Sequence, residues 1–207
     1  MKYPSLIATL VVAAFTTTVQ AVPANDQVMA AYQAGLQGDA NANTAATQQL
    51  TEQLKAHPSD ALTLALLGSS ETAGARYAEQ PWEKMQLSER GLARLDKALK
   101  QLKSKAEIEP AERFQVLTTA GCTFIALPPM FNRFDQGYQL LNKTISNPGF
   151  AHAPARSQVR TLLCGAQAAV QAGDKAQAQQ YMTSITSIAP QGPHIAMVEQ
   201  LKSKLGE

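Results

Sequence analysis

Aromatic residues, histidine and cysteine are scarce in this chain of 207 residues. It contains one Trp, five Tyr, six Phe, three His and two Cys. Strands favour aromatic and β-branched side chains, so this composition argues against a protein built on sheets. Ala and Gln are abundant instead, which favours closely packed helices. We therefore predict an all-α protein.

The chain also lacks a strong excess of charge of either sign. Eighteen Lys and Arg stand against sixteen Asp and Glu, a formal net charge of +2. Proteins that bind nucleic acid usually concentrate a large positive charge to neutralise phosphates. The near balance predicts that nucleic acid is not a partner.

Long hydrophobic runs are missing as well. The one apolar stretch of note, residues 6–15, is too short for a membrane-spanning helix, which needs about 20 residues. Lys2 precedes it and the small-residue sequence Val19-Gln20-Ala21 follows, a pattern typical of a secretory signal peptide. Residue 22 is Val and not Cys, so the pattern of a bacterial lipoprotein is absent.

These features predict a signal peptide at residues 1–21 and one mature domain at residues 22–207. No transmembrane segment is expected once the signal is removed. We expect an exported bacterial protein that resides in the periplasm, with secretion beyond the outer membrane as the less favoured alternative.

Motifs that carry chemistry are missing too. The sequence has no Cys-x-x-Cys and no pair of histidines at helical i, i+4 spacing, so no metal site is predicted. The serines within residues 68–74 lack the Gly-x-Ser-x-Gly order of a nucleophile elbow, and small residues at a helix interface explain this segment better. We predict neither a cofactor nor enzymatic activity.

What the sequence does contain is a chain of helical segments separated by Gly-Asp and proline breaks. In the longest of them, residues 81–103, apolar residues recur at spacings of three, four and seven, as expected for one face of a helix. Asp60 is placed to cap the third helix and Pro110 to begin the fifth. The expected helices cover residues 22–37, 44–56, 60–76, 81–103, 110–127 and 133–146, two that meet at Gly173-Asp174 and stop at Pro190, and 195–205.

The last third shows the most regular pattern. It reads Leu162-x2-Gly165-Ala166-x2-Ala169, then Gly173-Asp174, then Ala178-x3-Met182-x2-Ile185. Small residues on the first helix let the second pack closely, and large residues on the second fill the gap. This spacing resembles the tetratricopeptide repeat, a unit of about 34 residues.

The segment from Pro81-Trp82-x-Lys84-Met85 to Leu99 also resembles exported bacterial repeat proteins of undefined role. The chain departs from the standard repeat because the first helices lack a large aromatic residue near their start. The resemblance implies antiparallel helix pairs stacked as a short right-handed solenoid, closed by a C-terminal capping helix, and a role in binding other proteins.

The two cysteines, Cys122 and Cys164, are 42 residues apart on the first helices of neighbouring units. Neighbouring first helices lie side by side, so a disulfide is geometrically feasible in an oxidising compartment. The alternative is two small buried apolar residues. The sequence leaves both open.

Two surfaces are candidates for binding a partner. The first is the basic face of the helix from 81 to 103, which includes Arg90 and Arg94 and has a solvated face as its alternative. The second is the apolar, proline-rich connection 127–134, which either lines a groove or folds over the core. The predicted partner-binding residues are Trp82, Arg90, Arg94, Met130, Phe131 and Arg133.

The resulting hypothesis is a non-enzymatic scaffold or adaptor of the bacterial cell envelope that holds a protein or peptide segment in a helical groove. One alternative is an enzyme or accessory subunit acting on envelope polymers, which would need Glu71, Asp135 or a histidine to meet in one pocket. The other is a self-associating structural protein. The sequence does not identify the partner.

Overall fold

The computed structural model describes residues 26–104 and 108–206. These residues form α-helices, two short 3-10 helices and no strand, which confirms the all-α prediction. The predicted signal peptide, residues 1–21, lies outside the described residues. The elements are α1 (Asp26–Leu36), α2 (Ala40–Ala56), α3 (Ala61–Gly74), α4 (Pro81–Ser104), α5 (Pro110–Ala126), η1 (Pro129–Phe131), α6 (Phe134–Ile145), η2 (Pro148–His152), α7 (Ala155–Ala172), α8 (Lys175–Ile188) and α9 (His194–Leu205).

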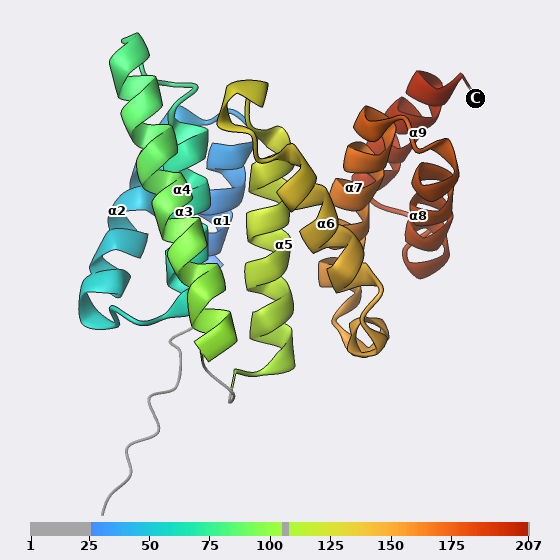
Figure 1. The fold of residues 1–207 in the computed structure, drawn as a ribbon, viewed down its shortest axis with the longest axis horizontal. Coiled ribbons are helices and arrows are strands. Elements are labelled where there is room, and N and C mark those ends of the chain that lie inside the picture. Colours follow the sequence, from blue (N-terminus) through green and yellow to red (C-terminus); the bar gives the residue numbers. More distant parts are fainter. Residues whose placement is uncertain (1–25, 105–107, 207) are drawn as a thin grey trace, which may run out of the picture.

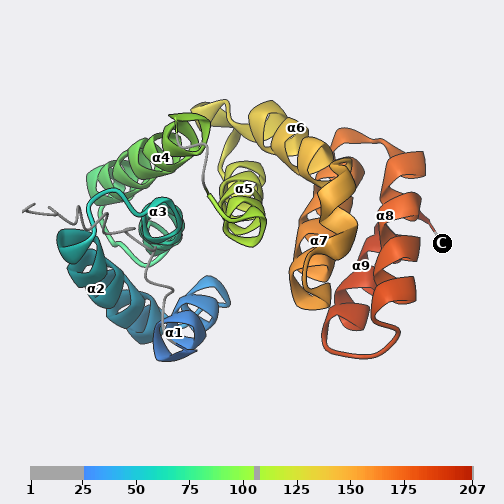
Figure 2. The ribbon, with the colours of Figure 1, turned by 90° about the horizontal axis from the view of Figure 1, so that it is seen from below.

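Consecutive helices pack in four pairs, α1 with α2, α3 with α4, α5 with α6, and α7 with α8 (Figure 1). The first helices of successive pairs also contact one another, α1 with α3, α3 with α5, and α5 with α7. Figure 2 shows the result as an arc, with α3, α5 and α7 on its inner side and α2, α4, α6 and α8 outside. The inner side of the arc is therefore built mainly from first helices.

Short acidic caps and prolines set where the helices begin. Asp60 accepts hydrogen bonds from the backbone of Leu62 and Thr63 at the start of α3, as expected from the sequence. Asp39 accepts a hydrogen bond from the backbone N–H of Ala42, so α2 begins at Ala40 and not near Thr44. The Ala/Asn/Thr segment 40–47 has only moderate helix propensity, and this cap explains why it is nevertheless helical.

A glycine lies where the two helices of each pair cross. A Cβ atom at Gly68 of α3 would stand 2.6 Å from the carbonyl oxygen of Gly91 in α4, closer than any real Cβ contact. In α5 and α6, a Cβ at Gly137 would stand 2.9 Å from the carbonyl oxygen of Gly121. The crossings of the other two pairs use Gly35 against α2 and Gly165 against α8.

The core runs along the arc as a series of clusters between the pairs. Leu95 and Phe124 are fully buried in one, and Leu162 and Ile185 in the next. Ser88 is a buried polar residue of α4, whose packed face also contains the small residues Gly91 and Ala98.

The last helix, α9, contacts α7 and α8 and buries Val198 and Leu201. It begins at His194, one residue before the predicted start. Among the described residues, no helix combines the length and apolar character needed to cross a membrane.

Candidate functional site

A groove of about 640 Å³ lies between the helices that form the inner side of the arc. Each of the four first helices, α1, α3, α5 and α7, contributes to it, so residues far apart in the sequence share one cavity. Its apolar part consists of Met29 and Ala30 from α1 and Leu62 and Leu66 from α3. Its polar lining consists of Asp26, Gln33, Gln115, Thr118, Thr119, Arg156, Ser157 and Arg160.

A chain of hydrogen bonds connects the four first helices beside this groove. Arg160 of α7 donates to the Tyr32 hydroxyl at 3.2 Å, and Tyr32 donates to Ser69 Oγ at 2.9 Å. Thr123 Oγ1 of α5 also lies 2.9 Å from Ser69 Oγ. Tyr32 and Ser69 are nearly fully buried, so these bonds are shielded from water. The chain fixes the position of α1 against α7.

Arginines on α7 reach across the groove to α1. Arg156 donates to the Gln33 side chain at 2.9 Å, and the Arg160 guanidinium lies 5.7 Å from the centre of the Tyr32 ring. Neither arginine forms an ion pair within the described part of the chain. Asp26 is the one carboxylate in the lining. The groove thus carries a net positive charge at the α7 side.

The groove brings together apolar and hydrogen-bonding side chains. Ser69 is held between two hydroxyls, and no histidine lines the cavity. Across residues 26–104 and 108–206, no group of three or more His, Cys, Asp or Glu is placed to hold a metal ion. What the groove offers is an apolar patch, hydrogen-bonding groups and two guanidinium groups, which suits reversible binding.

None of the six residues predicted to bind a partner lines this inner groove. Trp82 and Met130 are exposed, by 64% and 70%. Phe131 is half-buried and packs against the core cluster between α3, α4 and α5. Within the apolar connection 127–134, Met130 is therefore exposed, whereas Phe131 covers the core.

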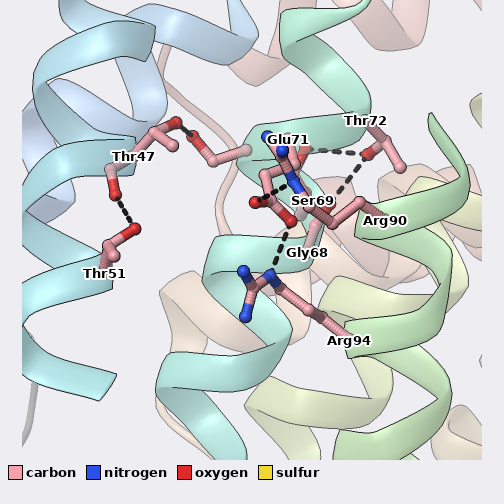
Figure 3. A network of polar contacts seen from close by, with 9 residues as sticks. Thr47, Thr51, Gly68, Ser69, Glu71, Thr72, Arg90 and Arg94 are labelled. Carbon is pink, nitrogen blue, oxygen red and sulfur yellow. Dashed lines mark hydrogen bonds and ion pairs between the residues drawn. The ribbon is translucent and has the colours of Figure 1, made fainter. Parts of the chain in front are cut away.

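Arg90 and Arg94 are tied to a buried carboxylate. Their Nε atoms donate to the two carboxylate oxygens of Glu71, both at 2.7 Å, as Figure 3 shows. The Glu71 side chain is only 3% exposed, whereas Arg90 is 48% and Arg94 28% exposed. This part of the predicted basic face holds α4 against α3.

Arg133 is also engaged within the fold. It donates two hydrogen bonds to Asp96 of α4, at 3.0 and 2.7 Å, and its guanidinium lies 5.2 Å from the centre of the Phe124 ring. Such a two-pronged pair fixes geometry as well as charge. Arg133 therefore connects the start of α6 to α4 and α5.

Cys122 of α5 and Cys164 of α7 form a disulfide, with Cα atoms 5.4 Å apart. This is one of the two alternatives that the sequence left open. The bond joins the first helices of neighbouring pairs, on the inner row of the arc. It covalently links the two helices that carry Gln115 and Arg160 of the groove.

The residues considered for an enzyme are not gathered in the groove. Glu71 is enclosed by its two arginines, and Asp135 is exposed in the first turn of α6. His194 is hydrogen-bonded to the Ala189 carbonyl at 2.8 Å, and His57 and His152 stand at the ends of α2 and η2.

Sequence reasoning missed the arginines of the groove. Arg156 and Arg160 have i, i+4 spacing and so share one face of α7, with no acidic residue in its first turn. That spacing in the sequence indicates a positively charged face on α7.

Comparisons with protein-family models, curated proteins and solved structures found no match to this chain.

Proposed function

We propose that this protein is a non-enzymatic scaffold that holds a segment of another protein in the inner groove of a tetratricopeptide-like solenoid. The observation that carries the proposal is the groove itself. It is open, about 640 Å³ in volume, and combines an apolar patch with convergent polar groups. Pockets of this kind are the default binding sites of proteins.

A repeat architecture is supported by features that recur in every pair. Each pair has a glycine at its crossing, and each first helix contacts the next. Stacked repeats of this kind form extended concave surfaces, which such proteins use for binding. We propose a right-handed stack, as the resemblance to tetratricopeptide repeats implies.

A role in the bacterial periplasm is proposed from two features. The first is the signal-like sequence at residues 1–21. The second is the Cys122–Cys164 disulfide, since such bonds persist mainly in oxidising compartments.

The charge of the groove favours a partner segment with acidic side chains. Arg156 and Arg160 have no carboxylate partner among the described residues, and their present hydrogen bonds go to neutral groups, Gln33 and Tyr32. A carboxylate would form stronger, charge-assisted bonds with them. Met29 and Leu62 beside them would accept an apolar side chain of the same segment.

Site-specific photo-crosslinking tests this proposal in intact cells. A photoreactive amino acid replaces Gln115, which is exposed in the groove, or Gln139, which is exposed on the outer helix α6 and serves as the control. A third variant carries it at Met130, to test the surface predicted from the sequence. Met130 is preferred over Phe131 because a substitution at half-buried Phe131 would also disturb the core.

A defined partner crosslinked from position 115 and not from 139 is the expected result. Crosslinks from position 130 alone would contradict the proposal and indicate that the partner binds near Met130 instead. If position 115 yields only a second copy of this chain, self-association replaces the adaptor hypothesis.

A further inference from the structure

A second groove lies on the other side of the helix layer, between the outer helices α4 and α6. Its volume is about 500 Å³, and α5 forms part of its floor. It shares no residue with the inner groove. Its lining residues come from α4, α5 and α6 and from the turn that follows α6.

The floor of this outer groove is apolar and incompletely covered. Leu99, Leu117 and Leu140 come from three different helices, and each is only half-buried. Below them, Leu102 and Phe114 are buried. Covering such side chains is favourable by about 25 cal/mol for each Å² of apolar surface removed from water. An apolar chain laid along the leucines would gain this energy.

The rim of the outer groove is positively charged at one end. Lys100 and Lys103 of α4 and Lys143 of α6 are exposed there, and none has a carboxylate partner within the described residues. At the opposite end, the carboxylate of Asp96 is already bound by two nitrogens of Arg133. Lysines in last helical turns also offset the helix dipole, but Lys100 lies before the last turn of α4.

The groove therefore has an apolar floor that leads to a cationic end. We propose that it binds a single-chain anionic amphiphile, with its alkyl chain on Leu99, Leu117 and Leu140 and its carboxylate or phosphate head between the lysines. The volume lies within the range of about 300–1,000 Å³ found for small-molecule sites.

Calorimetric titration of the mature chain, residues 22–207, tests this site with dodecanoate and dodecyl phosphate below their micelle concentrations. Both are expected to bind with one molecule per chain. Acetate and inorganic phosphate lack the alkyl chain, and dodecyltrimethylammonium has the opposite charge. All three are expected to bind at least tenfold more weakly.

Two triple variants separate the site from the general charge of the protein. Lys100→Gln, Lys103→Gln and Lys143→Gln together should weaken dodecanoate binding at least tenfold. The control replaces three exposed lysines outside the groove and should leave the affinity unchanged, with the same loss of charge. Its substitutions are Lys84→Gln, Lys97→Gln and Lys175→Gln.

A variant of the groove floor, Leu117→Gln, should weaken the binding of both dodecyl compounds. Circular dichroism should show that its helices remain intact. The proposal is overturned if the wild-type protein binds neither dodecanoate nor dodecyl phosphate. It is also overturned by equal weakening in the two triple variants, or by binding of inorganic phosphate as tight as that of dodecyl phosphate. None of these outcomes bears on crosslinking from position 115, so the inner-groove proposal is tested separately.

Discussion

Removing both arginines that bind Glu71 should destabilise the protein by more than the sum of the two single removals. The Glu71 side chain is 3% exposed and has both oxygens 2.7 Å from an arginine Nε. Arg90 is 48% exposed, so its loss alone should lower the free energy of unfolding by less than about 1 kcal/mol. Arg94 is 28% exposed, and its loss alone should cost about 1.5 kcal/mol, because a bond to a charged group is being broken.

Replacing both arginines by Gln leaves a buried carboxylate with no cation beside it. The expected loss is about 3–5 kcal/mol, more than the sum of the single effects. Adding Glu71→Gln to the double variant removes the unpaired charge. This triple variant should therefore regain at least about 2 kcal/mol, although it contains one more substitution.

Urea unfolding, followed by circular dichroism at neutral pH, measures all four variants against the wild type. The control is Lys84→Gln, at an exposed lysine of the same helix, which should change the free energy of unfolding by less than about 0.5 kcal/mol. The reasoning is refuted if the double variant is no less stable than the sum of the single effects predicts. It is equally refuted if Glu71→Gln destabilises the double variant further.

Three further predictions concern packing, the disulfide and a buried tyrosine. Gly91→Ala should lower the free energy of unfolding by about 1–3 kcal/mol in urea unfolding, because the new methyl group meets the backbone of Gly68, which cannot rotate away. The Cys122–Cys164 bond closes a loop of 42 residues. Reducing it should lower the free energy of unfolding by about 4 kcal/mol, measured by urea unfolding with and without dithiothreitol. Burial raises the pKa of Tyr181 to about 12, with Tyr138 and Asp174 adding to the rise. The folded protein therefore holds this proton more tightly than the unfolded chain, so stability should fall as pH rises from about 10 to 12, and less steeply in Tyr181→Phe.

Local signals account for most of the helices. Proline and Gly-Asp breaks, Asp60 as a cap and the leucine spacing of residues 81–103 act within a few residues of each other, so the sequence alone reveals them. The exception is the start of α2, where one aspartate, Asp39, outweighs a segment of moderate propensity. Apolar periodicity identifies a buried face by its large residues, whereas α4 also packs through small buried residues such as Ser88 and Gly91.

The binding surfaces were harder to predict because they depend on pairings between distant residues. Arg90 and Arg94 look like a free basic face until Glu71, on another helix, is placed beside them. Charge patterns along one helix cannot show which cations already have a partner across an interface. The same helix contributes Lys100 and Lys103 to the outer groove, where Lys143 joins them from α6.

The inner groove depends on the curvature of the whole arc. Arg156 and Gln33 are 123 positions apart in the sequence, and Arg160 and Tyr32 are 128 apart, yet both pairs are hydrogen-bonded. The contacts of α1 with α3, α3 with α5 and α5 with α7 all contribute to the approach of α1 to α7. The Cys122–Cys164 bond and the glycine crossings hold these angles, so they shape the groove although none of them lines it.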